Sequence, residues 1–339
     1  MTPNILRQPS DLRERNRYTA MNYFLLILGV AFLTAGGEAL IRGSLAAASR
    51  LGVSPLLSGL VIVGFGTSMP ELVVSVTAAL NEQPDIAIGN VVGSNISNVL
   101  LILGICALIA PMAVKPSVLR RDAITVVAAS LLFLVLAGGS ALGRADGLIL
   151  LTSLVAFLVW AYRSERLHAL PSADLHKAEA EELTALPKSA IGTVAIVIAG
   201  LLLLISGSQA LLKGAVGTAV HFGVSEAVIG LTLVAVGTSL PELSISVIAA
   251  LRRHADVAIG NVLGSNIFNL LGILGVSALL QPLPVHQRVL QFDQWAMLGT
   301  CAVLLIFLHT GTRLNRLEGA ILLIGYGVYV SLSFTTIGG

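Results

Sequence analysis

The chain has 339 residues, of which 55% are hydrophobic and only 11% are charged, and its mean hydropathy is +0.91. Soluble domains carry roughly 25% charged residues, so this composition excludes an ordinary soluble protein and predicts one that crosses a membrane many times. The formal net charge is +2, and the basic residues form no patch with interleaved aromatic residues, so we expect no nucleic-acid partner.

Apolar stretches along the chain predict an all-α polytopic membrane protein with ten transmembrane helices. The expected spans cover residues 22–48, 56–80, 86–110, 122–140, 146–162, 189–213, 227–251, 257–280, 290–309 and 317–335. Residues 1–20 are polar and resemble neither a cleavable signal peptide nor a folded domain, so they are expected to form an N-terminal tail. Residues 163–188 are the only long hydrophilic segment between spans, and we expect a cytoplasmic linker there.

An internal repeat dominates the sequence. Shifting the chain by 171 positions places residues 36–104 on residues 207–275 without a gap, and 37 of these 69 positions are identical. The first repeat (residues 21–162) and the second (residues 189–339) each hold five predicted spans. Because five is odd, the two halves must enter the membrane in opposite directions, which predicts an inverted repeat of the kind typical of secondary transporters.

Positive charges in the connections predict the orientation. Connections after even-numbered spans hold only Arg144, Lys213 and Arg288, whereas those after odd-numbered spans hold Arg50, Lys115, Arg120, Arg121, Arg163, Arg166, Lys177, Lys188, Arg252, Arg253, Arg313 and Arg316. We therefore expect the second set to face the cytoplasm and both termini to lie outside it, in the cell (inner or plasma) membrane. The four arginines of residues 1–20 argue for the opposite orientation, and a start at Met21 would remove this conflict.

Two glutamates fall near the middle of predicted spans. Glu71 lies in the segment GTSMPE and Glu242 in its repeat, GTSLPE. An unpaired carboxylate at the bilayer centre costs roughly 2.5 to 3.5 kcal/mol, so an intramembrane acid indicates function. No Lys or Arg lies near the middle of the second, third, seventh or eighth span. The expected counter-charge is therefore a bound cation, or protons when no cation is bound.

Oxygen-bearing residues surround each glutamate at helical spacing. Thr67, Glu71 and Ser75 share one predicted helix face, as do Thr238, Glu242 and Ser246 in the other half, and the stripes Asn90, Ser94, Asn98 and Asn261, Ser265, Asn269 match them on the following spans. Pro70 and Pro241 cannot donate a backbone hydrogen bond, so each favours a broken helix and frees the carbonyl of Gly66 or Gly237. Oxygen ligands of this kind suit Ca²⁺, Mg²⁺ or Na⁺, and flexible positions with two carboxylates favour Ca²⁺ over Mg²⁺.

The paired segments GTSMPELVVSV with GNVVGSNISN, and GTSLPELSISV with GNVLGSNIFN, resemble the two alpha-repeats of the sodium/calcium exchanger family, within the calcium/cation antiporter superfamily. The resemblance is most specific over residues 59–104 and 230–275. It implies a ten-helix inverted-repeat fold with adjacent sites for Na⁺ and Ca²⁺. Residues 163–188 are too few for the regulatory loop of animal exchangers, which implies a prokaryotic type.

The resemblance also implies a ligand for each matching position. It assigns Ca²⁺ and Na⁺ binding to Glu71 and Glu242, with contributions from Thr67, Ser68, Ser94 and Asn98 in the first half and Thr238, Ser239, Ser265 and Asn269 in the second. Some relatives carry Asp where this chain has Asn269, which removes one negative charge and weakens potassium dependence. The proton/calcium branch of the superfamily typically uses a different motif, so GTSxPE argues against that branch without excluding protons.

The sequence therefore predicts an antiporter that exchanges Ca²⁺ for Na⁺ by alternating access, without a cofactor and without enzymatic activity. The first and sixth spans, rich in glycine, are the expected sliding elements. An H⁺-coupled antiporter of Ca²⁺ or another divalent cation remains the alternative. A cation channel would also use acidic residues, but it would normally oligomerise around a pore. An intramembrane hydrolase with Ser68 or Ser239 as nucleophile would lack a histidine or lysine base at that depth. The expected partners are the transported ions and the lipid bilayer. The sequence does not indicate a protein partner.

Overall fold

The computed structural model describes residues 12–113, 116–167, 189–222, 237–310 and 313–337. Residues 1–11 of the predicted tail, residues 168–188 of the predicted linker and residues 227–236 of the seventh predicted span therefore lie outside the described part of the chain. Where it is described, the protein is mostly helical, as expected from its composition.

The elements of the first half follow the predicted spans closely. In chain order they are α1 (Leu12–Leu51), α2 (Pro55–Ser58), the π-helical turn η1 (Gly59–Gly64), α3 (Phe65–Thr67), α4 (Met69–Leu80), α5 (Pro84–Ser97), the π-helical turn η2 (Asn98–Leu103), α6 (Gly104–Ile109), β1 (Met112–Ala113), α7 (Pro116–Ala137), β2 (Ala141–Leu142) and α8 (Arg144–Leu167). Two helices run past their predicted limits: α1 begins inside the predicted tail, and α8 continues past Arg163, where the linker was expected to begin.

The second half repeats this order as far as it is described. It contains α10 (Ala190–His221), α13 (Leu240–Leu251), α14 (Ala255–Ile267), the π-helical turn η4 (Phe268–Ile273), α15 (Leu274–Leu280), β3 (Leu283–Pro284), the π-helical turn η5 (Val289–Asp293), α16 (Gln294–Thr310), β4 (Arg313–Leu314) and α17 (Arg316–Ile337). Helix α10 extends to residue 221, beyond the predicted end at residue 213.

Within the described residues, six continuous helical segments are long and apolar enough to cross a membrane. They are Thr19–Leu51, Pro84–Ile109, Arg144–Glu165, Ala190–His221, Ala255–Leu280 and Val289–Leu308. A seventh candidate is a broken pair, Pro55–Thr67 and Met69–Leu80, bent by 46°. Large apolar side chains cover the outside, with Ile27 71% and Ile191 84% exposed. The protein is therefore a multi-pass membrane protein.

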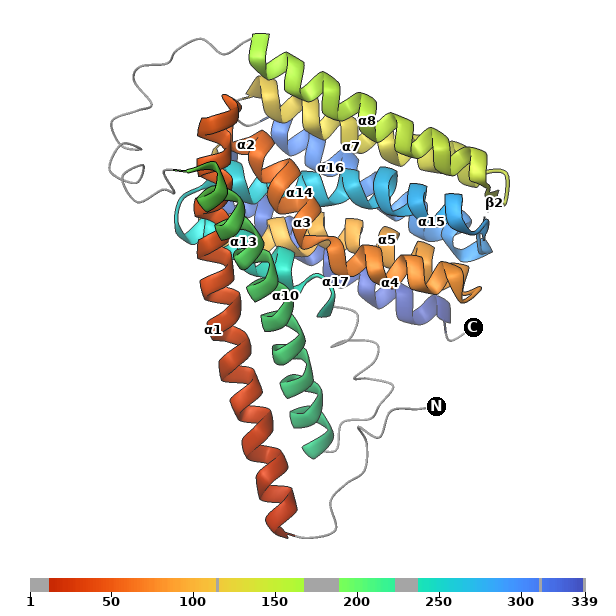
Figure 1. Cartoon of the computed structure of the whole chain (residues 1–339). Helices are drawn as coiled ribbons and strands as arrows, with labels where there is room; N and C mark the ends of the chain where they lie inside the picture. The colour runs from red at the N-terminus through yellow and green to blue at the C-terminus, as the bar shows by residue number, and fades with distance from the viewer. Residues whose placement is uncertain (1–11, 114–115, 168–188, 223–236, 311–312, 338–339) are drawn as a thin grey trace.

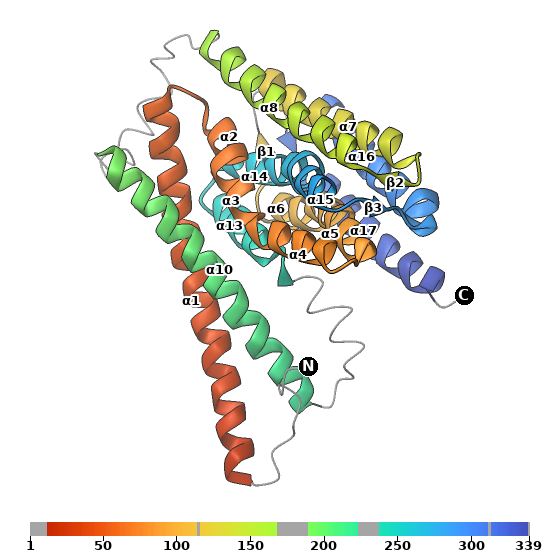
Figure 2. The ribbon, with the colours of Figure 1, turned by 45° about the vertical axis from the view of Figure 1, so that its right-hand side comes forward.

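Helices α1 and α10 form a long pair that leans away from the remaining helices (Figures 1 and 2). Glycines spaced seven residues apart line their contact on both sides: Gly29, Gly36 and Gly43 on α1, and Gly200, Gly207 and Gly214 on α10. Gly36 faces the backbone of Gly200, and Gly207 faces the backbone of Gly29, so the two helices run antiparallel. Glycine at these positions lets the two backbones approach closely.

Two short ribbons join the halves of the chain. Strand β1 pairs with β4 and β2 pairs with β3, both antiparallel. Met112 and Ala113 of β1 correspond to Leu283 and Pro284 of β3 at the repeat shift of 171, so each ribbon takes one strand from each half.

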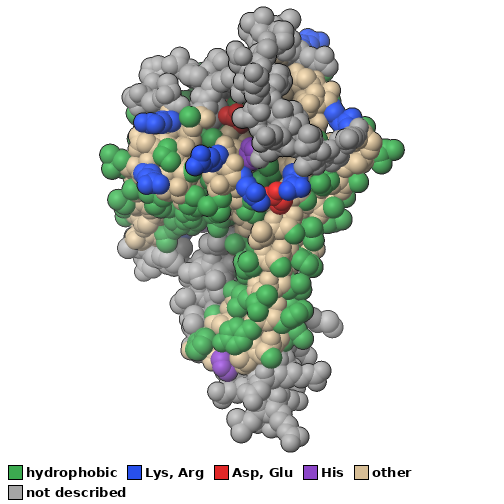
Figure 3. All heavy atoms as spheres, turned by 90° about the vertical axis from the view of Figure 1, so that its left-hand side faces the viewer, with side chains coloured by type: hydrophobic (Ala, Val, Ile, Leu, Met, Phe, Trp, Pro, Cys, Tyr) green, Lys and Arg blue, Asp and Glu red, His purple; other side chains and the backbone are tan. Residues whose placement is uncertain are grey.

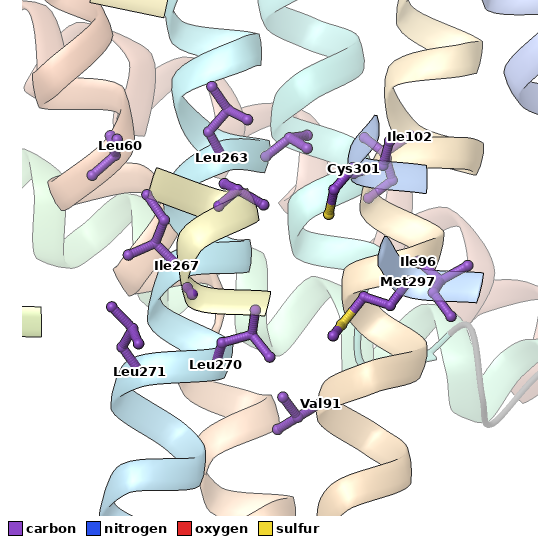
Figure 4. Packing of buried hydrophobic residues seen from close by; sticks show 14 of the residues in the cluster. Leu60, Val91, Ile96, Ile102, Leu263, Ile267, Leu270, Leu271, Met297 and Cys301 are labelled. Carbon is purple, nitrogen blue, oxygen red and sulfur yellow. The ribbon is translucent and has the colours of Figure 1, made fainter. Parts of the chain in front are cut away.

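The core lies between α5, α14 and the helices around them. Leu60, Val91, Ile96, Leu263, Ile267 and Met297 pack together there, and each is at most 2% exposed (Figure 4). Gly260 faces the carbonyl of Leu56 and the amide nitrogen of Leu60, so α14 lies directly against α2 and η1. Close packing at this contact fixes the broken segment that precedes Glu71.

Candidate ion-binding site

The helix break predicted at Pro70 is present, and in the other half the described residues show a turn at Ser239 before α13 begins at Leu240. Helix α3 ends at Thr67, α4 begins at Met69, and Pro70 occupies the first turn of α4. Ser68 at the break has φ −81° and ψ 9°, and Ser239 in the other half has φ −85° and ψ 7°. Glu71 and Glu242 therefore both lie in the first turn of a helix, where the exposed amide groups favour a negative charge.

Each glutamate accepts a hydrogen bond from the opposite half. The Ser68 hydroxyl donates to Oε1 of Glu242 at 2.9 Å, and the Ser239 hydroxyl donates to Oε1 of Glu71 at 3.2 Å. Both carboxylates are 1% exposed. The two acids thus lie in one buried network, as the repeat predicted.

Four buried side-chain oxygen atoms of the predicted ligands accept no hydrogen bond from the described residues. They are Oε2 of Glu71, Oε2 of Glu242, Oδ1 of Asn98 and Oδ1 of Asn269. At the repeat shift of 171 they form two equivalent pairs. A buried acceptor without a partner costs about 1–3 kcal/mol, and more when it is charged. A cation bound among these atoms would remove that cost.

Two asparagines that the sequence analysis did not single out orient the free amide oxygens. Nδ2 of Asn98 donates to Oδ1 of Asn266 at 3.0 Å, and Nδ2 of Asn269 donates to Oδ1 of Asn95 at 3.1 Å. Asn95 and Asn266 in turn each donate to the other's backbone carbonyl at 3.2 Å. Because the amide nitrogens are held in this way, the Oδ1 atoms of Asn98 and Asn269 remain available. Asn95 and Asn266 occupy equivalent positions of the two repeats, and this identity was the signal that could have identified them.

A second pair of asparagines supports the broken helices. Asn90 donates to the carbonyl of Glu71 at 3.2 Å and to the Ser75 hydroxyl at 2.9 Å. Asn261 makes the equivalent bonds to Glu242 and Ser246 at 3.1 and 2.7 Å. The polar stripes predicted on neighbouring spans therefore face one another. Their role here is structural, since these side chains hold the backbone that carries each acid.

The remaining predicted residues lie around the same network. Thr67 donates to Oδ1 of Asn261 at 3.1 Å, and Ser265 donates to the carbonyl of Gly64 at 3.0 Å. Ser94 is buried, and Thr238 is half-buried. The break at Ser68 lies between Thr67 and Glu71, so these two do not share a continuous helix face as expected.

Helix α10 covers both breaks. The hydroxyl of Ser208, another residue that the sequence analysis missed, donates to the Gly237 carbonyl at 2.9 Å. The carbonyl freed by Pro241 therefore already has one protein partner. A Cβ at Gly66 would meet Leu201, and one at Gly237 would meet Leu212, both on α10.

The donor set itself narrows the chemistry. The described residues contain no group of three or more His, Cys, Asp or Glu side chains that could hold a metal ion. The buried network instead combines two carboxylates with amide, hydroxyl and carbonyl oxygens. Hard oxygen ligands of this kind, most of them uncharged, suit alkali and alkaline-earth cations.

Comparison with known proteins decides the family. The family described as "Sodium/calcium exchanger protein" matches residues 21–163 and 192–335, which hold both halves of the network. The chain belongs to the sodium/calcium exchanger family. This confirms the resemblance inferred from the paired motifs.

Several relatives of this exchanger family match over nearly their whole length. The chain is 39% identical to the putative antiporter CaxA of Alkalimonas amylolytica, over 92% of this chain and 98% of CaxA. It is 32% identical to the sodium/calcium exchanger MaX1 of Methanosarcina acetivorans, over 93% and 99% of the two chains. These coverages agree with the predicted short form of exchanger, since they leave no room for an inserted regulatory loop.

The solved structure of a sodium-calcium exchanger has the same fold. NCX_Mj soaked with zero Na⁺ and Ca²⁺ superposes with a TM-score of 0.79 at 28% sequence identity, covering 92% of this chain and 99% of that one. The structure of the same exchanger soaked with 10 mM Na⁺ and 10 mM Sr²⁺ gives a TM-score of 0.78. The exchanger fold therefore extends over almost all of the present chain.

Proposed function

We propose that this protein is a secondary antiporter that exchanges Ca²⁺ for Na⁺, with both ions bound in turn between Glu71 and Glu242. The observation that carries the proposal is the set of four buried oxygen atoms without a donor among the described residues, one carboxylate and one amide oxygen from each half. The relatives named sodium/calcium exchangers support the choice of ions. In this proposal the ions are the cargo, no cofactor takes part and no covalent bond is made or broken.

The proposed ligands come equally from both halves. They are the side-chain oxygens of Thr67, Ser68, Glu71, Ser94, Asn98, Thr238, Ser239, Glu242, Ser265 and Asn269, with the carbonyls of Gly66 and Gly237. Ca²⁺ takes about six to eight oxygen ligands, so one calcium ion would use only part of this set and leave oxygens for Na⁺. Two carboxylates balance the charge of one Ca²⁺ or two Na⁺. Overlapping use of the same acids makes the two ions compete, which is the basis of exchange.

The proposed architecture is ten transmembrane helices in two inverted five-helix repeats, residues 21–162 and 189–339, joined by a cytoplasmic linker at 163–188. Three features support it. Helices α1 and α10, which correspond in the repeat, run antiparallel. Both ribbons pair strands from different halves. The hydrogen bonds around Glu71 recur around Glu242 at a constant shift of 171.

Alternating access is the proposed mechanism. Occupied sites neutralise the two acids and permit the switch, whereas two uncompensated carboxylates resist it. The glycine-lined pair α1 and α10 is the proposed sliding element, because α10 touches both helix breaks through Leu201 and Leu212. A shift of this pair would uncover first one end of the site and then the other.

The proposed location is the cell membrane, with both termini outside the cytoplasm. Lys and Arg side chains gather at one end of the face shown in Figure 3, above a band of hydrophobic side chains. This distribution agrees with the positive-inside rule applied to the connections after odd-numbered spans.

The decisive experiment is Ca²⁺ uptake into proteoliposomes under an imposed Na⁺ gradient, and separately under an H⁺ gradient. We expect uptake that requires Na⁺ on the opposite side, saturates with Ca²⁺, and is abolished by Glu71→Gln or Glu242→Gln. Glu38→Gln is the matched control, because Glu38 lies in α1 and pairs with Arg42 and Arg252 away from the site.

Uptake driven by the H⁺ gradient alone would transfer the proposal to a proton-coupled antiporter. Flux that continues without any counter-ion would indicate a channel. Undiminished uptake in both glutamine variants would refute the site.

A further inference from the structure

A buried cluster of charged side chains lies at the end of the molecule where α7 begins and α8 ends. Arg121 donates to both carboxylate oxygens of Asp122, at 2.7 and 3.0 Å, and to Oε1 of Glu165 at 3.3 Å. None of the three side chains is more than 7% exposed. Removing one partner from such a cluster leaves an uncompensated buried charge and is destabilising, so the three side chains depend on one another.

Glu165 extends the cluster to a third element. It accepts hydrogen bonds from the backbone nitrogen of Ser54 at 2.6 Å and from the Ser54 hydroxyl at 2.8 Å. Ser54 is the N-cap of α2, where its Oγ accepts from Leu57 N at 3.1 Å. The start of α2 is therefore fixed to α7 and α8. Helix α2 continues through η1 and α3 to Thr67 and Ser68 in the ion site.

The corner between α1 and α2 is short and contains a hinge-like residue. Gly52 has φ +65°, and no atom of the described residues lies within 4 Å of its Cβ position. Val53 N donates to the Ala48 carbonyl, which closes the end of α1 immediately before Ser54. Gly52 and Val53 are the only residues between the end of α1 at Leu51 and the Ser54 cap of α2. The buried hydroxyls of Ser44 and Ser58, 2.8 Å apart, tie α1 to α2 beyond this corner.

Within the described residues these ties are found at one end of the molecule; the equivalent corner, where the sequence repeats Gly52, Val53 and Ser54 as Gly223, Val224 and Ser225, lies outside them. The repeat replaces the four polar residues by apolar ones: Ala215 for Ser44, Ile229 for Ser58, Phe292 for Arg121 and, at the shift of 172 that relates β2 to β4, Ile337 for Glu165. Asp122 keeps its counterpart, Asp293, but that residue pairs with Arg288 and Tyr329 of its own half. The two ends are thus chemically different although the ion site between them is symmetric.

We propose that Glu165 and Arg121 are positioning residues that clamp the α1–α2 corner and hold this end of the transporter closed. The proposal rests on the proposed function. In an inverted repeat the two access states are related by symmetry, so a tie present at one end makes them unequal in free energy. The clamp therefore sets the ratio of the two states, and the ions reach the site more readily from the opposite end.

The test measures the apparent KM for Ca²⁺ from each face separately, in right-side-out and inside-out membrane vesicles. At each face the apparent KM rises as the fraction of protein open to that face falls. Releasing the clamp should therefore lower the KM at one face and raise it at the other. We expect Glu165→Gln to lower the KM about tenfold at the clamped face and to raise it at the other. Ser54→Ala should shift both values in the same sense but less, and Ser54→Thr should restore them.

Arg42→Ala, which breaks an exposed pair on α1, is the control and should leave both KM values unchanged. A loss of maximal rate with both KM values unchanged in the Glu165 and Ser54 variants would overturn the clamp. If Glu165→Gln does not fold, Ser54→Ala decides the question, because it retains every charge. Failure of the unmodified protein to exchange Ca²⁺ for Na⁺ would refute the proposed function instead.

Discussion

At the centre of the molecule several hydrogen bonds of one half recur in the other, whereas at the ends the described contacts of the two halves differ. Ser68 donates to Glu242 as Ser239 donates to Glu71, and Asn95 and Asn266 donate to each other's carbonyls at the same distance. Near the α1–α2 corner, by contrast, Arg121 and Glu165 of a buried ion cluster correspond to the apolar residues Phe292 and Ile337 in the other half. The proposed ion site takes ligands from both halves, which would favour symmetry where the halves meet. In the proposed orientation the two ends face different compartments, which would allow them to differ.

The first test of this symmetry is to remove either Asn95 or Asn266, whose side chains bond to each other's backbone carbonyls. Asn266→Ala removes the acceptor for Nδ2 of Asn98, and Asn95→Ala removes the acceptor for Nδ2 of Asn269. Each change frees a side-chain amide on the opposite half to rotate, so a site oxygen is lost. We expect a cost of about 1–2 kcal/mol in Ca²⁺ binding, near tenfold in affinity, and a similar value for both variants.

Calcium binding to purified protein, measured by titration calorimetry, checks this expectation. Asn315→Ala is the control, because Asn315 caps α17 through the Glu318 backbone amide and lies outside the ion network. A large loss in one variant and none in the other would show that the central network is not functionally symmetric.

A smaller effect on Ca²⁺ binding is expected where α1 touches α10. A Cβ at Gly36 would lie 2.8 Å from the Leu204 nitrogen, and one at Gly207 would lie 2.9 Å from the Leu33 nitrogen. Backbone atoms cannot move aside as side chains can, so Gly36→Val and Gly207→Val should separate α1 from α10 and cost about 1–3 kcal/mol. We expect a lower melting temperature and slower exchange with unchanged Ca²⁺ affinity, measured on the same preparations. Gly325→Val on α17, where the nearest atoms are 3.6 Å from the Cβ position, is the control. Unchanged exchange rates in both variants would argue against movement at this contact.

The helical fold and the contact between the two GTSxPE segments could be predicted from the sequence. The paired GTSxPE segments predicted the helix breaks, and the shift of 171 predicted that Glu71 and Glu242 would meet. Both followed from elementary properties: proline cannot donate to the preceding turn, and an acid within the membrane requires a partner.

Other features required three-dimensional contacts. Asn95 and Asn266 are identical in the repeat, but only their crossed hydrogen bonds reveal that they orient Asn98 and Asn269. The π-helical turn η2, which begins at Asn98, has no recognisable sequence signal. Arg121 was counted as a loop charge facing the cytoplasm, whereas its contacts with Asp122 and Glu165 bury it. The positive-inside rule counts basic residues from the sequence alone, so it cannot distinguish an exposed arginine from one that is buried in an ion pair.

The smallest effect is expected where one residue meets its own repeat counterpart. Ser130 on α7 corresponds to Cys301 on α16 at the shift of 171, and their Oγ and Sγ atoms lie 3.6 Å apart. Ser130→Cys replaces a small buried side chain by another and should change stability by under about 1 kcal/mol in reducing buffer. A membrane-permeable oxidant should then join the introduced thiol to Cys301, which mass spectrometry of the digested protein would detect. Ser153→Cys on α8, whose hydroxyl donates to the Ile149 carbonyl of its own helix, should form no such link. Because the contact lies between equivalent positions of the two halves, failure to cross-link would contradict the symmetric packing of α7 against α16.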